Sequence, residues 1–185
     1  FFICKSTGSA DSWHTYWAEL GRGEYVNIYP VGTGTSSDQF GSQEPNPVSF
    51  YVKANTGSGA NKADGMIYYL WHSVEGFSKF SSYEGTGGDV FVYCGFRPRI
   101  ITIKNADQTN NWLTYDTARN TTNPSDASIQ WDNSYNDTGI TNDTIDILSN
   151  GFMIKATRND LTRDGDKILF GAWAEHPFAS NCRAR

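Results

Sequence analysis

The sequence repeats itself, and this internal repeat limits the folds that the chain can adopt. Residues 1–20 align with 100–119, and residues 49–73 align with 151–175. The matched pairs include Lys5 with Lys104, Trp13 with Trp112, Tyr16 with Tyr115, Phe50 with Phe152, Lys53 with Lys155 and Trp71 with Trp173. A repeat of this kind predicts two copies of one structural unit, in which matched rings fill equivalent places in two cores. Stacking of Trp13 and Trp112 on a ligand such as a sugar is the alternative.

The two copies differ in their middle and at their start. Residues 21–48 and 120–150 hardly match and are rich in Gly, Pro, Ser, Asn and Asp, which is typical of surface loops. The second copy has a lead-in, residues 81–99, that predicts one or two strands and has no counterpart before Phe1. We therefore expect a first repeat at 1–78 that lacks its first strand or strands, and a complete second repeat at 79–185. We expect the natural chain to extend upstream of Phe1, or the missing strand to come from elsewhere.

Hydrophobic periodicity predicts an all-β fold. Residues 90–96 alternate with a period of two, which is typical of a strand with one buried face. Residues 167–173 are apolar on both faces, with Ile168, Phe170 and Ala172 on one and Leu169 and Trp173 on the other, so they predict a central strand. Further predicted strands lie at 49–54, 66–71, 128–131, 145–148 and 151–156. About seven strands per copy predict two tandem antiparallel β-sandwiches of jelly-roll or concanavalin-like style.

Charge and composition exclude some classes of protein. The formal net charge is −5 and no cluster of Lys and Arg appears, so the sequence does not predict binding to nucleic acid. No apolar run approaches the ~18 residues of a membrane span, so no membrane partner is expected. The cysteines are Cys4, Cys94 and Cys182, at spacings that fit no metal motif. We expect reduced, buried thiols, with one disulfide and one free thiol as the alternative.

Candidate catalytic groups do not recur between the copies. Asp116 aligns with Trp17, and Glu175 aligns with Ser73, so no pair of carboxylates is repeated for acid and base chemistry. The histidines are His14, His72 and His176, which form no metal-binding pattern. The sequence therefore predicts no catalytic residue, no cofactor and no enzyme. A hydrolase that works in one copy alone is the alternative.

One acidic loop, residues 158–167, is a weak calcium candidate. It places Asp160, Asp164 and Asp166 close together, and carboxylate oxygens are the ligands that Ca²⁺ prefers. The spacing does not match an EF-hand loop, so we expect a solvated acidic turn and no metal.

The second copy carries the motifs of a known family. Residues 93–120 and 148–178 resemble a domain of unknown function found, often in tandem, in tail-fibre-like and other virion proteins of phages of aquatic bacteria. The matching residues are Gly95, Phe96, Pro98, Lys104, Trp112, Tyr115, Asp116, Arg119, Asn150, Gly151, Phe152, Trp173, Ala174, Glu175, Pro177 and Phe178. The resemblance covers 77–178 well and 1–76 more loosely, because Trp17 and Leu20 stand at the positions of Asp116 and Arg119.

The resemblance implies an extracellular virion component without established catalytic residues. We expect a non-enzymatic tail fibre or surface appendage that forms homo-oligomers, contacts other virion subunits and binds glycans on the host surface. The candidate glycan contacts are Trp131 and Tyr135 in the second copy and Tyr25 and Tyr29 in the first. A secreted carbohydrate-binding module or lectin and a polysaccharide hydrolase are the alternatives.

Overall fold

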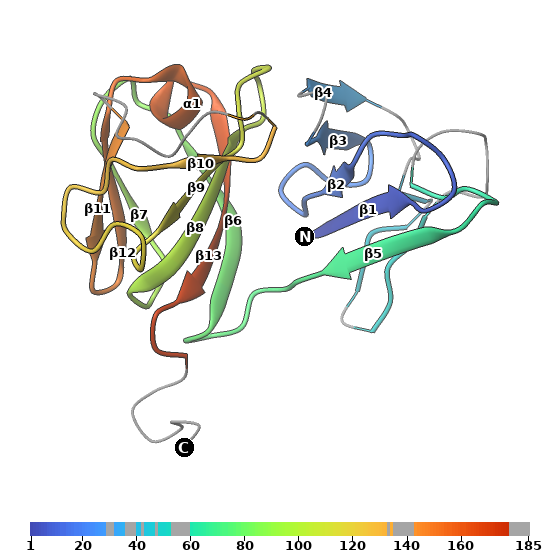
Figure 1. The fold of residues 1–185 in the computed structure, drawn as a ribbon, viewed down its shortest axis with the longest axis horizontal. Coiled ribbons are helices and arrows are strands. Elements are labelled where there is room, and N and C mark those ends of the chain that lie inside the picture. The colour runs from blue at the N-terminus through green and yellow to red at the C-terminus, as the bar shows by residue number, and fades with distance from the viewer. Residues whose placement is uncertain are drawn as a thin grey trace. The chain divides into compact units, whose positions relative to one another are not determined.

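The chain folds almost entirely into antiparallel β-sheets. The computed structural model describes residues 1–28, 32–35, 40–41, 43–46, 48–52, 60–132, 134 and 143–177 (Figure 1). These residues form three antiparallel sheets and one short helix. They divide into two compact units, Phe1–Trp71 and His72–Arg185. The all-β class and the antiparallel pairing predicted from the sequence are thus confirmed.

Unit 1 contains one five-stranded sheet. Its strands are β1 (Phe2–Ser6), β2 (His14–Tyr16), β3 (Glu24–Asn27), β4 (Gly32–Thr35) and β5 (Met66–Leu70). Their order in the sheet is β4-β3-β2-β1-β5, so the last strand in the sequence lies beside the first. Within the described residues, β5 pairs with β1 alone and forms an edge of the sheet.

Unit 2 contains two sheets and the helix. Its elements are β6 (Ser78–Glu84), β7 (Val90–Tyr93), β8 (Pro98–Asn105), β9 (Leu113–Asp116), β10 (Ile129–Gln130), β11 (Asp143–Leu148), β12 (Gly151–Ala156), α1 (Asn159–Thr162) and β13 (Lys167–Ala174). One sheet has the order β10-β9-β8-β13-β6, and the other has the order β11-β12-β7. The boundary between the two repeats was predicted after residue 78, and Ser78 is the first residue of β6.

The two sheets of unit 2 share one hydrophobic core. Residues of β7, β8, β9, β11, β12 and β13 point into it, so both sheets contribute: Val92, Ile101, Ile103, Leu113, Tyr115, Ile145, Ile147, Phe152, Ile154, Ile168, Phe170 and Ala172. Strand β13 lies between β8 and β6, and Ile168, Leu169 and Phe170 are at most 1% exposed. The prediction of a central strand with two apolar faces is therefore confirmed.

Among the described residues, unit 1 has a smaller hydrophobic core with more partly buried members. Phe2, Cys4, Tyr16, Phe40 and Ala60 are its buried members. Around them pack residues that are only partly buried, namely Tyr25, Phe50, Val52, Met66 and Tyr68. The rings of Phe2 and Tyr16 stack with centroids 5.1 Å apart, so aromatic contacts form much of this core.

Three details differ from the sequence-based expectations. The described part of unit 1 has five strands and that of unit 2 has eight, where about seven each were expected. Residues 49–52 form no regular strand, although a strand was predicted at 49–54; residues 53–59 lie outside the described part. The four-residue helix α1 was not predicted, because so short a turn leaves no helical periodicity in the sequence. Cys4 and Cys94 are free and buried as expected, and Cys182 lies outside the described residues.

A core substitution tests the packing of unit 2. Phe152 is fully buried, so we expect Phe152→Ala to lower the free energy of unfolding by roughly 3–5 kcal/mol, through lost burial and the cavity that remains. The control is Phe91→Ala on the neighbouring strand, where the ring is 46% exposed and the expected cost is below about 1 kcal/mol. Urea unfolding followed by tryptophan fluorescence measures both. Equal costs for the two variants would contradict the packed core.

Candidate functional site

The residues predicted to contact glycans fall in different settings. Trp131 follows β10 and stacks on the buried Trp112, with ring centroids 5.2 Å apart and planes 5° apart. One face of its ring is therefore covered, and the side chain is half-buried. Tyr25 is half-buried against the core of unit 1, and its ring lies over Gly34 so closely that a β-carbon there would come within 2.4 Å. Tyr29 and Tyr135 lie outside the described residues.

The three aspartates of the calcium candidate do not converge. Asp160 pairs with Arg158, and Asp166 accepts a hydrogen bond of 2.8 Å from the Asn105 side chain. The Asp164 side chain lies beside Gly87, because its Cβ would be the nearest atom to a β-carbon added to that glycine. In the described part of the chain, no group of three potential metal ligands occurs. The two partnered carboxylates therefore hold the loop itself, and Asp160 is buried rather than solvated as the sequence predicted.

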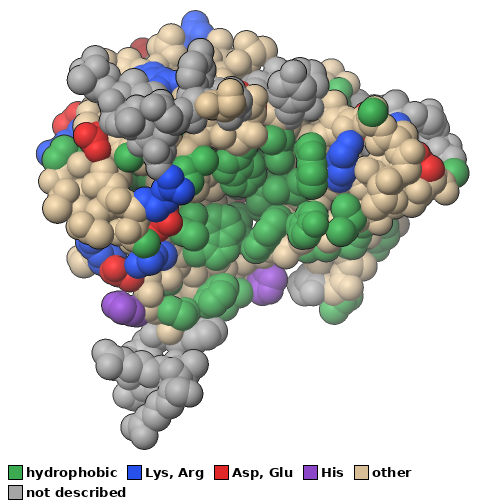
Figure 2. All heavy atoms as spheres, in the orientation of Figure 1, with side chains coloured by type: hydrophobic (Ala, Val, Ile, Leu, Met, Phe, Trp, Pro, Cys, Tyr) green, Lys and Arg blue, Asp and Glu red, His purple; other side chains and the backbone are tan. Residues whose placement is uncertain are grey.

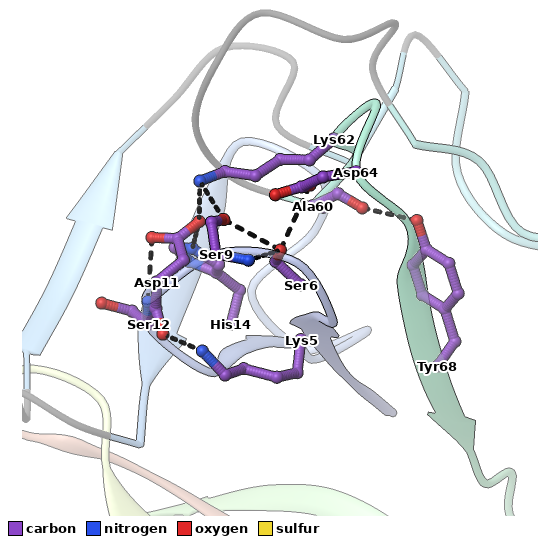
Figure 3. A network of polar contacts seen from close by, with 10 residues as sticks. All are labelled: Lys5, Ser6, Ser9, Asp11, Ser12, His14, Ala60, Lys62, Asp64 and Tyr68. Carbon is purple, nitrogen blue, oxygen red and sulfur yellow. Dashed lines mark hydrogen bonds and ion pairs between the residues drawn. The ribbon is translucent and has the colours of Figure 1, made fainter.

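A polar cluster lies at the end of β1 in unit 1 (Figure 3). The Asp11 carboxylate pairs with Lys62 at 3.0 Å and approaches Nε2 of His14 to 3.8 Å. Lys62 also donates to Oγ of Ser9 at 3.2 Å, and the Ser6 hydroxyl lies 2.9 Å from that of Ser9. Burial acts to raise the pKa of Asp11, but the hydrogen bonds from Lys62 and Ser12 and the charges of His14 and Lys62 outweigh it, so the pKa is lowered.

This cluster contains serine, histidine and aspartate but not the geometry of a nucleophile. A serine nucleophile needs the histidine within hydrogen-bond reach of its hydroxyl. Here Ser6 instead donates to Asp64 at 3.2 Å, and Ser9 receives a bond from Lys62. The cluster ties the loop after β1 to the loop before β5, which is a structural use of these groups.

Unit 2 has buried polar groups at the corresponding end of β8. Lys104 is fully buried, and its ammonium group donates to the backbone carbonyls of Asn105 at 2.6 Å and Gln108 at 2.7 Å. Burial lowers the pKa of Lys104 to about 8, and the charges of Asp160 and Asp132 oppose that shift. The Asn105 side chain is bound to Asp166. The polar atoms of Lys104 and Asn105 are thus engaged by the backbone and by Asp166.

Hydrophobic side chains also reach the surface of the molecule, as the face drawn in Figure 2 shows. Among the described residues of unit 2, the exposed large ones are Phe77, Phe91 and Tyr93, at 38%, 46% and 58%. Phe91 and Tyr93 lie on β7, and they alternate with Val90 and Val92, which pack into the core. Two aromatic rings are thus fixed on the outer face of an ordered sheet. We call Phe91, Tyr93 and their neighbours on this face the β7 face.

Polar groups border the two rings of the β7 face. Lys79 on β6 donates to the carbonyl oxygen of Tyr93 at 2.9 Å, and its ammonium group lies 5.2 Å from the centre of that ring. Met153 lies opposite Phe91 on β12, and two positions along β12 Lys155 pairs with Asp146 at 2.8 Å. An aromatic surface with charged groups at its border can stack on apolar faces of a sugar and hydrogen-bond its hydroxyls.

Sequence reasoning missed the β7 face, although the signal was present. The alternation over residues 90–96 predicts Val90, Val92 and Cys94 on the buried side. The same alternation places Phe91 and Tyr93 on the outer side, and large aromatic residues at outward positions indicate a contact surface.

A hollow elsewhere in unit 2 has two carboxylate side chains in its lining. It is lined by Ser82, Tyr83, Glu84, Asp107, Gly165 and Lys167. The Asp107 carboxylate accepts a hydrogen bond of 2.6 Å from the backbone N–H of Lys167, so it holds a turn. Glu84 and Asp107 are the groups to change in a test for hydrolase activity.

Comparison with known proteins gives a family but no function. Residues 1–177, which run through both units, match a family described as a domain of unknown function. No curated protein and no solved structure matches the chain. No helix among the described residues is both long and apolar enough to cross a membrane.

The buried His14 makes the stability of the chain depend on pH. Burial lowers the pKa of His14 below its ordinary value of 6.5, although the Asp11 charge partly opposes this. Below pH 6.5 the unfolded chain therefore binds more protons at this position than the folded chain, and stability falls as the pH falls from 6.5 through the folded pKa. We expect His14→Asn to remove this part of the loss when urea unfolding is compared from pH 7.5 to pH 5.

A second variant checks the sign of this effect. Asp11→Asn removes the charge that favours the protonated imidazole, so the loss between pH 6.5 and pH 5 should become deeper. A shallower loss in Asp11→Asn would contradict the assignment to His14.

Proposed function

The chain belongs to the DUF7483 family, whose function is unknown, and we propose that it is a non-enzymatic structural protein of a phage particle that binds host-surface glycans. The phage assignment comes from the sequence resemblance over residues 77–178. The glycan proposal is carried by one observation, the exposed ring pair of Phe91 and Tyr93 on an ordered sheet. In this proposal the protein is extracellular, and its partners are other virion subunits, copies of itself and the host glycan.

A duplicated sandwich is the architecture that we propose for this role. Strand pairing supports it, because matched residues pair in the same register in both units. Phe2 pairs with Tyr16 and Leu70 in unit 1, and Ile101 pairs with Tyr115 and Ala172 in unit 2. The repeat aligns these residues in the same way.

Hydrogen bonds outside the strands correspond in the same manner. The N–H of Thr7 donates to the Gly65 carbonyl at 3.1 Å, and the N–H of Ala106 donates to the Lys167 carbonyl at 2.9 Å. Likewise, Ser6 donates to Asp64 and Asn105 donates to Asp166. Agreement at the loop ends as well as in the strands favours one ancestral unit over two unrelated sheets. In unit 2 the shared core of two sheets is what a β-sandwich requires.

The polar clusters support a scaffold rather than an enzyme. At the end of β1 the hydroxyls of Ser6 and Ser9 and the ammonium group of Lys62 contact one another, and at the end of β8 the buried Lys104 donates to two backbone carbonyls. Such networks fix loops in place and stabilise a fold. Binding then falls to the side chains that face solvent, as on the β7 face.

A glycan-binding measurement tests the proposal. We expect purified protein to bind a subset of bacterial surface polysaccharides on an array, and Tyr93→Ala to weaken that binding by about tenfold, the effect of losing roughly 1.4 kcal/mol of stacking. Trp131→Ala reports on the site predicted from the sequence. Val48→Ala is the control, because Val48 is 93% exposed but lies in unit 1.

The alternatives give different results in the same experiment. A hydrolase would release sugars from the polysaccharide and lose that activity in Glu84→Gln or Asp107→Asn. A secreted lectin would bind glycans that bacteria do not carry. Retained binding in both Tyr93→Ala and Trp131→Ala would contradict both proposed contact sites.

A further inference from the structure

Lys79 reaches the β7 face from the other sheet of unit 2. It lies opposite Ala172, which belongs to the core, so the Lys79 side chain also starts on the core side of β6. Within the described residues, β6 and β7 are edge strands of their two sheets. Packed sheets lie about 10 Å apart, and the long side chain of a lysine crosses much of that distance. The ammonium group therefore arrives beside the backbone of Tyr93.

The contacts of this ammonium group leave its charge available to a ligand. It donates a hydrogen bond of 2.9 Å to the carbonyl oxygen of Tyr93, in exposed surroundings, and an ammonium group has three donors. It lies 5.2 Å from the centre of the Tyr93 ring. Among the described residues, no carboxylate forms an ion pair with Lys79. A positive charge is thus fixed beside a ring that is 58% exposed.

The other lysine of the β7 face is already neutralised. Lys155 on β12 pairs with Asp146 on β11 at 2.8 Å. Asp146 lies opposite Met153, and Met153 lies opposite Phe91, so this ion pair belongs to the end of the face where Phe91 lies. The two ends of the face therefore differ in charge, with a closed ion pair near Phe91 and a single cation beside Tyr93.

The charge at Lys79 is opposite in sign to that of the whole chain. The formal net charge is −5, so the protein has no general attraction for polyanions. In ordinary salt solutions, exposed charges more than about 10 Å apart are largely screened. A ligand that touches the Tyr93 ring therefore senses the neighbouring ammonium group more strongly than the distant carboxylates. Binding of an acidic ligand here would depend on that local contact.

We propose that the β7 face selects acidic glycans, in which the carboxylate of a uronic acid pairs with Lys79 while the sugar ring rests against Tyr93. The remaining N–H donors of the ammonium group bind the carboxylate, and Phe91 offers a second ring on the same face. A neutral sugar gains the ring contacts alone, so the cation supplies the specificity. This inference rests on the proposed glycan binding at the β7 face and names the class of sugar that it takes.

Matched oligosaccharides test the selection. The probes are tetrasaccharides of galacturonic acid and of mannuronic acid, each beside its carboxyl-reduced neutral counterpart, titrated into the full chain by calorimetry. We expect an acidic probe to bind roughly threefold more tightly than its neutral counterpart, because one exposed ion pair contributes about that much. The preference should shrink in about 1 M salt, where the charges are screened. Equal affinities for the acidic and neutral forms would overturn the inference.

Variants at two lysines show whether Lys79 recognises the carboxylate. The quantity compared is the ratio of the affinities for the acidic and neutral forms. Lys79→Gln should reduce this ratio to about one, and Lys79→Arg should preserve it, because arginine keeps the charge. Lys155→Gln is the matched control and should leave the ratio unchanged, since that ammonium group is already paired with Asp146. An unchanged ratio in Lys79→Gln, with both affinities lowered alike, would mean that Lys79 only positions the Tyr93 ring and would overturn the inference.

The same measurements separate this inference from the proposed function. Binding of neutral glycans without a preference for acidic forms overturns the selection and leaves glycan binding in place. Absence of binding to these probes, with binding to other glycans on the array, has the same meaning. Absence of binding to all glycans removes the proposed function as well. Self-association through the β7 face, seen as a dimer mass that returns to that of one chain in Phe91→Ala, would overturn the inference in favour of a subunit contact.

Discussion

The register of one strand with its two neighbours is the constraint on which each unit depends. In unit 2, β8 lies between β9 and β13, and this pairing turns Ile101 and Ile103 toward the core. Successive residues of a strand point to opposite faces, so a slip by one position would bring Thr102 and Lys104 inward instead. Such a slip would place an ammonium group among aliphatic side chains, at a cost of several kcal/mol. The hydrophobic pattern therefore fixes the register, and the register fixes which loops meet at the ends of the sheet.

The opposite face of β8 is also buried, and its polar groups are matched to that environment. The hydroxyls of Thr102 and Thr114 lie 2.9 Å apart on neighbouring strands. Lys104 directs its charge along the strand to two backbone carbonyls, which avoids an unsatisfied buried donor. The cost of burying the charge appears in the lowered pKa of Lys104, to about 8. Each of these buried polar groups needs a hydrogen-bond partner, and the observed strand pairing supplies it. The polar groups therefore contribute to the specificity of the strand pairing, while the hydrophobic core supplies most of the stability.

Periodicity in the sequence was enough to predict individual strands, but not whether each segment finds a pairing partner. Alternation over residues 90–96 and the doubly apolar run at 167–173 located β7 and β13, because side-chain burial on a strand repeats every two residues. The segment at 49–52 carries the same pattern as β12, yet it forms no regular strand. Local sequence cannot reveal that loss, since it depends on a pairing partner distant in the chain. Likewise, Trp131 was predicted to contact a glycan, but its stacking on Trp112 depends on the path of the chain after β10.

Within the described residues, the sheet edges of the two units differ in their side chains. On the edge of unit 2, Lys79 places a positive charge beside the backbone of Tyr93, and charged side chains discourage the addition of further strands. That same lysine holds the Tyr93 ring in place, so the group that protects the edge also orients the proposed contact surface. Strand β5 has no charged residue and no proline, and its Ile67, Tyr69 and Leu70 are exposed. An edge of this composition carries none of the charges or prolines that discourage strand addition, so the side chains of a sheet edge, and not the fold alone, set how readily it pairs with another strand.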